Sequence, residues 1–321
     1  MGVFLNIFRG KASAKGDANA AGTACLVDER FELVSLAFRL AGRAPYADTA
    51  DGYQKALDAR FGTYGKHPAV AYARRNLNFG YDAVFSMAIH LEKTSGAFAL
   101  VGNTGFLLSC RRWTKDSAGG FVALLNDFYA DAGFAGFFQE NAGLYMKRSE
   151  RFRRDVLRRF NFGWFAAHGA SPGNLRVVLS PTSGNYGGAV YGATPRDNIV
   201  YAALRCAKRY GKSAASTLAH EFAHSFANPI AQAWYGQDAK FRKLCDDSVD
   251  AGNLPFYANG MVMAFEYVTR AYDALYMAEN FGGAAGRYLR AHKKRGFKHI
   301  EEVYALVAKG YKFSRDECYV R

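Results

Sequence analysis

Hydrophobic positions recur with a helical period through the first half of the chain. Between Asp28 and Ala41, one helix face carries Phe31, Val34, Phe38 and Ala41, and leucines cover a second face. The stripe that stays polar is narrow and consists of Glu32, Ser35 and Arg39. A helix with so little polar surface is expected to be well buried, and Gly42 is expected to end it.

The same period predicts three further helices before residue 165, over Gly80–Glu92, Phe121–Phe128 and Tyr145–Phe160. After Gly163 the pattern changes to short strands, predicted over Asn174–Ser180, Ala189–Tyr191 and Asn198–Leu204, with a loop rich in Gly, Ser and Pro over 181–188. Helices are then predicted over Ser213–Asn228, Asp238–Asp247, Ala258–Asn280 and Lys298–Lys309.

These elements divide the chain into three parts. Residues 1–26 read as a flexible leader, 27–165 as a helical region, and 166–321 as a region that combines a small sheet with helices. The expected fold class is α+β and mostly helical.

The amino-acid composition limits the classes of protein to which the chain can belong. The 321 residues are 50% hydrophobic, which is enough to bury a core and argues against a largely disordered chain. No run offers the ~20 predominantly apolar residues that a membrane-spanning helix needs. The five cysteines are widely spaced and are expected to be free thiols, mostly buried. No signal-peptide pattern is convincing, so the compartment stays open.

The chain is strongly basic, with 42 Lys and Arg against 28 Asp and Glu and a formal net charge of +14. This balance favours anionic partners. Within Tyr145–Phe160, one helix face is expected to carry Lys147, Arg151, Arg154 and Arg158. That stripe can dock on an anionic surface or polymer, or it can be the solvated face of a packed helix. No zinc-finger, RNP or P-loop pattern accompanies it, so no specific nucleic-acid module is predicted.

The motif His220-Glu221-Phe222-Ala223-His224 has the form H-E-x-x-H. On a helix, residues i and i+4 lie about 40° apart around the axis, so both imidazoles can bind one ion. Glu221 flanks them, where its carboxylate can accept a proton from a metal-activated water. Ser213 is a plausible N-cap for this helix, and Asn228-Pro229 is expected to end it.

A catalytic zinc uses about three protein ligands, so a third must come from elsewhere. The acidic candidates downstream are Asp238, Asp246, Asp247, Asp250, Glu266, Asp273 and Glu279. Glu266 is favoured because its neighbours in the sequence are apolar, and a buried carboxylate needs a partner. The alternative partner is Arg270, four residues later on the same helix.

The order strand, Gly-rich loop, strand, HExxH helix and later helix with a glutamate resembles the gluzincin class of zinc metallopeptidases. The resemblance implies a zincin-like region with one Zn²⁺ per chain held by His220, His224 and Glu266, and Glu221 as general base. From Val27-Asp28-Glu29-Arg30 through 220–226 to Glu266, the chain is also similar to a little-characterised bacterial family of gluzincin-like proteins without an assigned function.

Two features depart from the gluzincin pattern. Gluzincins commonly carry an acid four residues after the ligand glutamate, where this chain has Arg270, so Asp273 is expected to orient a ligand histidine instead. The spacing from His224 to Glu266 is long, which makes 231–259 an insertion. The tyrosines considered as donors to a developing oxyanion are Tyr186, Tyr191, Tyr257 and Tyr267.

Two functions remain as expectations. The first is a zinc-dependent hydrolase, in particular a metallopeptidase that acts on a peptide or protein substrate. The alternative is a non-catalytic protein of zincin fold that engages an anionic surface or polymer through its basic helix.

Overall fold

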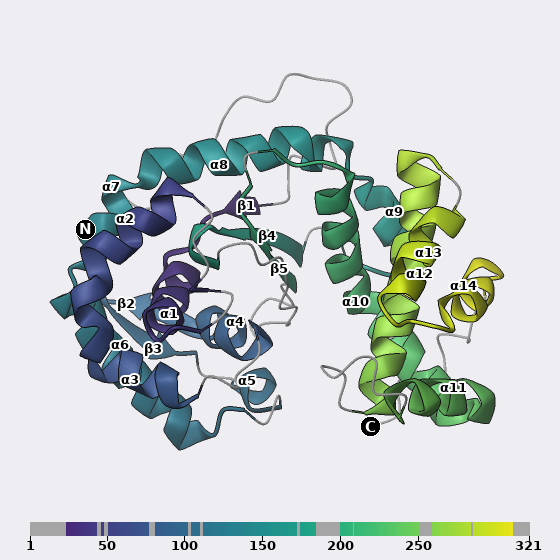
Figure 1. Ribbon diagram of the computed structural model, residues 1–321, viewed down its shortest axis with the longest axis horizontal. Helices are drawn as coiled ribbons and strands as arrows, with labels where there is room; N and C mark the ends of the chain where they lie inside the picture. Colours follow the sequence, from purple (N-terminus) through teal and green to yellow (C-terminus); the bar gives the residue numbers. More distant parts are fainter. Residues whose placement is uncertain are drawn as a thin grey trace.

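The structure is a computed structural model, and it describes residues 24–43, 46–47, 51–76, 81–101, 104–109, 112–171, 174–183, 200–207, 209–250, 259–283 and 285–310. These residues form two lobes that lie side by side (Figure 1). Most of them are helical and a few form a small sheet, as the expected α+β class requires. No helix among them is both long enough and apolar enough to span a membrane.

Helices surround the sheet in the N-terminal lobe. They are α1 (Glu29–Leu40), α2 (Gly52–Phe61), α3 (Pro68–Arg75), α4 (Tyr81–Ile89), α5 (Gly105–Ser109), α6 (Lys115–Asp131), α7 (Phe134–Glu140) and α8 (Ala142–Asp155). Three short 3-10 helices accompany them: η1 (Gly62–Lys66), η2 (Leu157–Arg159) and η4 (Pro181–Ser183). The predicted helix over Asp28–Ala41 is confirmed as α1, and Phe121–Phe128 is part of α6.

The main sheet consists of β1 (Ala24–Leu26), β4 (Leu175–Ser180) and β5 (Val200–Arg205) in the order β1-β4-β5. Both pairs are parallel, with Cys25 opposite Val177 and Val177 opposite Ala202. β1 belongs to the predicted leader and β4 and β5 to the predicted C-terminal region, so residues far apart in the sequence share this sheet. The sheet lies in the N-terminal lobe, where α8 contacts β1 and α1 contacts η4, directly after β4.

A second, two-stranded sheet corrects one predicted boundary. The helix expected over Gly80–Glu92 ends at Ile89 in α4, and Leu91 and Glu92 belong to β2 (Leu91–Thr94). β2 pairs antiparallel with β3 (Ala97–Leu100). The two-residue turn between them, Ser95-Gly96, has positive φ at both positions, which is the conformation that closes a tight hairpin.

The stripe of α1 that was expected to stay polar is buried. Glu32 is fully buried and accepts hydrogen bonds from the Ser180 hydroxyl at 2.8 Å, from the Thr182 hydroxyl at 2.6 Å and from the Tyr53 hydroxyl at 3.1 Å. Arg39, at the other end of the stripe, is buried as well and binds Asp58 at 2.6 Å. Buried charges need partners of this kind, and these partners join α1 to α2 and to the end of β4.

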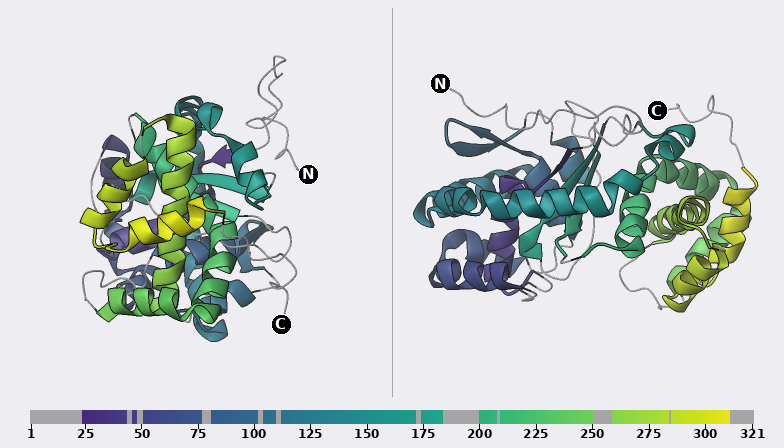
Figure 2. Two further views of the ribbon diagram at one scale, coloured as in Figure 1. Left: turned by 90° about the vertical axis from the view of Figure 1, so that its right-hand side faces the viewer. Right: turned by 90° about the horizontal axis from the view of Figure 1, so that it is seen from above.

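The C-terminal lobe is a group of helices (Figure 2). It consists of α9 (Phe162–Ala167), α10 (Lys212–Gln237), α11 (Ala239–Asp250), α12 (Gly260–Phe281), α13 (Ala285–Lys294) and α14 (Ile300–Ala308). The helices predicted over Asp238–Asp247, Ala258–Asn280 and Lys298–Lys309 are confirmed, with shifted ends, as α11, α12 and α14. The residues expected as an insertion, 231–259, include the end of α10 and all of α11.

Both predicted ends of the HExxH helix are wrong. The helix begins after Gly211 rather than at a Ser213 cap, and it passes through Pro229 to end at Gln237. A proline inside a helix removes one backbone hydrogen bond. Burial of Asn228, Ala231 and Trp234 on both sides of Pro229 supplies the packing that carries the helix through.

The basic helix is also shorter than predicted. α8 ends at Asp155, and Arg158 lies in η2. Arg151 is half-buried, whereas Lys147, Arg154 and Arg158 are exposed. The four cations therefore do not form one continuous helical stripe, and binding to an anionic surface stays a prediction.

Several other predictions concern residues outside the described part. The leader up to residue 23, the Gly-rich loop from 184 onwards and the strand over Ala189–Tyr191 all lie there. Among the described cysteines, Cys25, Cys206 and Cys245 are free, and two of these are buried, as expected. Cys110 and Cys318 are outside the described residues.

The environment of Glu32 predicts a pH-dependent stability. Burial raises the pKa of Glu32 from 4.5 to about 7, against the hydrogen bonds from Thr182, Ser180 and Tyr53 and the charge of Arg148, which lower it. When the pH lies between the unfolded-state pKa of 4.5 and the folded-state pKa of about 7, the folded state binds more protons than the unfolded state. The free energy of unfolding therefore falls as the pH rises through this range. We expect this contribution to be about 1–3 kcal/mol between about pH 5 and pH 8.

The free energy of unfolding, measured by urea titration at about pH 5 and at about pH 8, checks this prediction. Glu32→Gln removes the titrating group and should flatten the dependence, whereas Glu150→Gln, at an exposed position of α8, should keep the wild-type dependence. An unchanged pH dependence in Glu32→Gln contradicts the assignment.

Candidate metal centre

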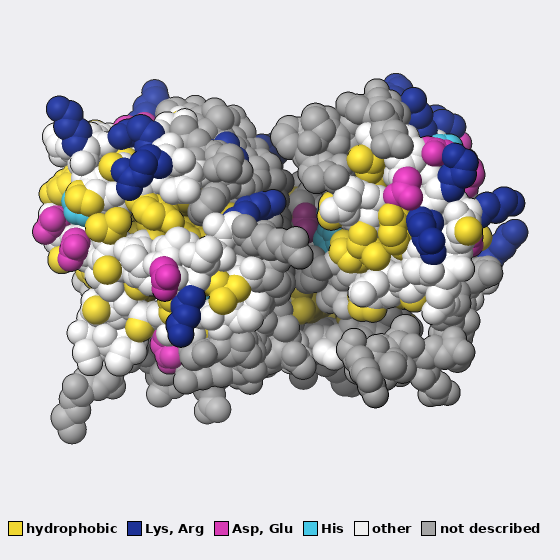
Figure 3. All heavy atoms as spheres, turned by 90° about the horizontal axis from the view of Figure 1, so that it is seen from below, with side chains coloured by type: hydrophobic (Ala, Val, Ile, Leu, Met, Phe, Trp, Pro, Cys, Tyr) yellow, Lys and Arg dark blue, Asp and Glu magenta, His cyan; other side chains and the backbone are white. Residues whose placement is uncertain are grey.

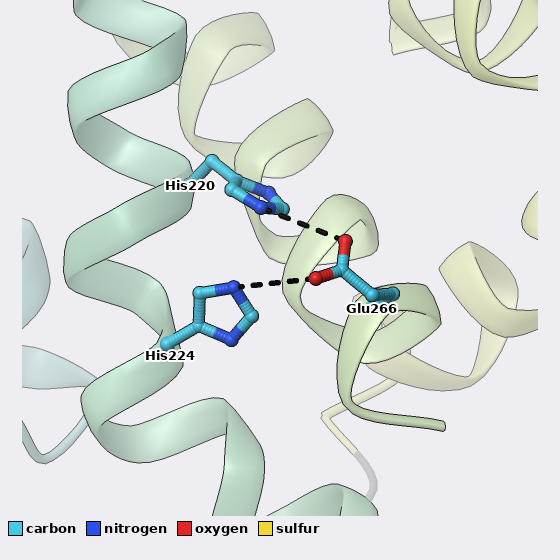
Figure 4. A group of neighbouring side chains, drawn as sticks. All are labelled: His220, His224 and Glu266. Carbon is cyan, nitrogen blue, oxygen red and sulfur yellow. Dashed lines mark ion pairs between the residues drawn. The ribbon is translucent and has the colours of Figure 1, made fainter. Parts of the chain in front are cut away.

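α10 and α12 pack against each other, and three side chains meet between them (Figure 4). Nε2 of His220 lies 3.7 Å from Oε2 of Glu266, and Nε2 of His224 lies 3.8 Å from Oε1 of the same carboxylate. Ligand atoms of all three residues lie within 4.8 Å of one another. The structure thus brings together the three residues predicted as ligands, in an arrangement that could hold a metal ion.

The hydrophobic side of α10 determines which way the histidines point. Phe222 and Phe226 lie one turn apart, and both contact Phe165 of α9 with ring centroids 6.2 Å away. His220 and His224 lie on a different side of the same turns, toward α12. Packing of the phenylalanines against α9 therefore orients the imidazoles toward Glu266.

Both histidines are in the neutral form that binds metals. Their side chains are only 12% and 9% exposed. Burial lowers the pKa of His220 well below its ordinary value, and the charge of Arg270 lowers it further. Burial also lowers the pKa of His224. A neutral imidazole keeps a lone pair for a metal ion, which a protonated one lacks.

Hydrogen bonds indicate which nitrogen of His224 carries the proton. Its Nδ1 lies 2.9 Å from Oδ1 of Asn228, four residues later on α10, and 3.1 Å from Oγ1 of Thr269 on α12. The amide oxygen of Asn228 can only accept, so Nδ1 carries the proton and donates it. Nε2 is then the unprotonated nitrogen, and Nε2 is the atom that faces Glu266.

The donor set at this site fits zinc. Two neutral imidazoles and one carboxylate form a common three-residue set of catalytic zinc sites. The Nδ1 atom of His220 is buried and lacks a hydrogen-bond partner among the described residues, while its Nε2 atom faces Glu266. The residues present therefore form a group that could hold a metal ion.

The ion pair that was the alternative interaction of Glu266 is present. Its Oε2 accepts a hydrogen bond from Nη2 of Arg270 at 2.8 Å, and each of its oxygens faces one histidine. The ion pair along α12 and the contact with α10 are compatible because a carboxylate has lone pairs for several partners.

Glu221 lies next to this group. Its Oε2 is 4.0 Å from Nε2 of His224. Burial raises the pKa of Glu221 to about 8, and the nearby charge of Glu266 contributes in the same direction, while Arg270 opposes it. This is the position beside the two histidines that the HExxH spacing predicts.

Asp273 does not orient a ligand histidine, contrary to expectation. It accepts hydrogen bonds from the Ser216 hydroxyl at 3.0 and 2.9 Å and lies 3.6 Å from Nε2 of His292. Asn228 and Thr269 take that role for His224. Neither was predicted, although Asn228 could have been noticed from its i+4 spacing; it was read as a helix end.

The other acidic candidates have partners away from the site. Asp238 accepts from the first backbone N–H groups of α11, Asp246 accepts from Tyr235, Asp247 binds Lys243, and Glu279 accepts from Trp164. The side chain of Asp250 is outside the described part.

Of the four tyrosine candidates, the structure describes Tyr267. Tyr186, Tyr191 and Tyr257 are outside the described residues. Tyr267 is fully buried, and its hydroxyl bonds with Ser248 at 2.9 Å and with the backbone N–H of His299 at 3.4 Å. These contacts tie α12 to α11 and α14, so Tyr267 is a packing residue.

The two lobes leave a hollow between them. Seen from below, histidine and acidic side chains are visible on the wall of this hollow that belongs to the C-terminal lobe (Figure 3). Most of the molecule's charged side chains on this face lie farther out. A hollow with acidic and imidazole groups on one wall is a place where a ligand can approach.

Comparison with known proteins identifies the family. A mostly helical α+β fold with a three-residue group that could hold a metal defines the broad class. The chain belongs to the family described as Domain of unknown function (DUF4932), whose model matches residues 48–318. Searches of curated proteins and of solved structures each found no match.

The contacts of Asn228 generate a prediction about metal affinity. Asn228→Ala removes one of the two groups that lie at the Nδ1 atom of His224, so the orientation of the ring is held less firmly. We expect zinc to bind about 10–100-fold more weakly, as is typical when such an outer partner is lost. Competition with a chromophoric chelator measures the dissociation constant. The control variant Ser225→Ala removes a hydroxyl from the same helix and should leave the dissociation constant unchanged. An Asn228→Ala variant that binds zinc as tightly as the wild type would refute the role of Asn228.

Proposed function

We propose that this protein is a zinc-dependent hydrolase, and specifically a metallopeptidase of gluzincin type with a zincin-like region over residues 166–321, which includes β4, β5 and the HExxH helix. The observation that carries the proposal is the meeting of His220 and His224 on α10 with Glu266 on α12, with Glu221 beside them. The HExxH spacing and the resemblance to gluzincins support the same function. Histidine and acidic groups on the wall of the hollow support access for a peptide.

The residues would divide the work as follows. His220, His224 and Glu266 would hold one zinc ion. When bound, zinc supplies Lewis acidity that polarises an amide carbonyl and makes hydroxide available at neutral pH. Glu221 would take the proton of the attacking water on its carboxylate and return it to the nitrogen of the leaving amine. Asn228 and Thr269 would keep the His224 ring in the orientation in which Nε2 faces Glu266.

Metal content is the first test. Elemental mass spectrometry of the purified protein, reconstituted at neutral pH and desalted, should give about one zinc per chain. Glu266→Ala should lose or loosen it because one of three ligands is gone. Glu301→Ala, at an exposed glutamate that pairs with Lys293, should keep it. A wild-type protein without zinc after reconstitution contradicts the proposal.

The role of Glu221 is tested by Glu221→Gln. The amide is similar in size but cannot accept the proton, so zinc should stay bound while the rate of peptide hydrolysis falls by at least about 10²-fold. A quenched-fluorescence peptide library, read with equal zinc loading, provides the measurement. Hydrolysis at the wild-type rate would remove Glu221 from the mechanism. A zinc-loaded wild type that cleaves no peptide would instead exclude the peptidase activity and leave the metal site standing.

A further inference from the structure

A chain of polar side chains connects Glu266 to α13 and back to α10. Its members, here called the Arg270 chain, are Arg270, His292, Asp273 and Ser216. Asp273 and His292 are 2% and 6% exposed, so their polar atoms contact each other rather than solvent. None of these residues is part of the HExxH motif, and Arg270 stands where gluzincins commonly carry an acid.

Arg270 binds Glu266 and is itself held in place. Its Nη2 donates to Oε2 of Glu266 at 2.8 Å, and its guanidinium carbon lies 4.2 Å from the ring centroid of Phe297. Stacking on the ring restricts the plane of the guanidinium. Phe297, which lies between α13 and α14, therefore helps to direct the guanidinium toward Glu266. The position of Arg270 on α12 does not set this direction alone.

His292 provides the next link. Its Nδ1 lies 3.5 Å from Nη1 of Arg270. A guanidinium only donates, so Nδ1 is the acceptor and the ring proton is on Nε2. That nitrogen faces Oδ2 of Asp273 at 3.6 Å. In this orientation the ring directs one nitrogen at Arg270 and the other at Asp273.

Asp273 returns the chain to the helix of the ligand histidines. It accepts two contacts from the hydroxyl of Ser216, at 3.0 and 2.9 Å. Ser216 lies one helical turn before His220 on α10. The carboxylate of Glu266 is therefore connected by side chains to Ser216 on the helix that carries His220, as well as by the packing of α10 against α12.

We propose that Arg270 is a positioning residue that holds the Glu266 carboxylate for the metal ion, with His292 and Asp273 keeping Arg270 in place. The proposal rests on the zinc site of the proposed function. Arg270 occupies one side of Oε2, which stops the carboxylate from rotating away from the two imidazoles. Its positive charge also balances the two neighbouring carboxylates, Glu221 and Glu266, which would otherwise repel each other.

The test measures zinc affinity rather than activity. Dissociation constants are determined by chelator competition for wild type, Arg270→Met and Arg270→Lys. Loss of the guanidinium should weaken zinc binding about 10–100-fold. Lysine keeps the charge but lacks the planar fork, so it should restore part of the affinity. His292→Gln should give a smaller weakening than Arg270→Met because it acts through Arg270.

A matched control separates this role from the general loss of a buried arginine. Arg148 in the N-terminal lobe is 11% exposed and pairs with Asp51 at 2.7 Å, while Arg270 is 13% exposed in its pair with Glu266. Arg148→Met should therefore leave the zinc affinity at the wild-type value. Circular dichroism of each variant verifies folding, and Arg270→Lys keeps the test valid if Arg270→Met does not fold.

The visible spectrum of the cobalt-substituted protein gives a second readout. Its bands depend on the ligand geometry, so Arg270→Lys should shift them and Arg148→Met should not. Zinc binding as tight as wild type, or tighter, in Arg270→Met together with an unchanged cobalt spectrum in Arg270→Lys would overturn the positioning role. A wild-type protein that binds no zinc would instead show that the proposed function has failed.

Discussion

The packing of α10 against α12 buries charged and polar groups between two helices, and the candidate site depends on how those groups are paired. Glu266 and Arg270 point out of α12 and need partners because an unpaired buried charge is costly. They find them in His220, His224 and in each other. On the far side of α10, Phe222 and Phe226 pack against Phe165 of α9. The helix is thereby held from both sides, which leaves little freedom to the imidazoles.

The N-terminal lobe also contains a buried carboxylate that needs partners, in this case on α1. Glu32 is buried on α1 and is surrounded by hydroxyl donors from α2, from the last residue of β4 and from η4. This carboxylate holds the end of the parallel sheet against the N-terminal helices. Each lobe therefore has its own buried carboxylate with several partners. Between the lobes lies the hollow, so a ligand there would meet the wall with histidine and acidic side chains on one side and the sheet-bearing lobe on the other.

Local patterns predicted the elements best where one period dominated. α1, α12 and β4 were predicted close to their observed bounds because their apolar residues repeat with a clear helical or strand period. The predicted ends of helices were wrong where tertiary packing outweighed the local sequence signal. Pro229 is a helix breaker by itself, yet α10 continues through it because its neighbours are buried. Leu91 and Glu92 joined a hairpin because Ser95 and Gly96 form its turn. The segment containing α13 was not predicted as a helix at all, and with it the contribution of His292 was missed.

The sequence by itself determined that two histidines and a glutamate lie on one side of a helix, since the HExxH spacing places them there in any α-helix. It also limited the candidates for a third metal ligand to seven acids, with Glu266 preferred because its neighbours in the sequence are apolar. Only the tertiary structure decided that Glu266 meets the histidines while Asp273 binds Ser216 and His292. It alone showed that Asn228 and Thr269 orient His224. The physical reason is that spacing fixes directions around one helix axis, whereas contacts between helices depend on how their buried faces pack.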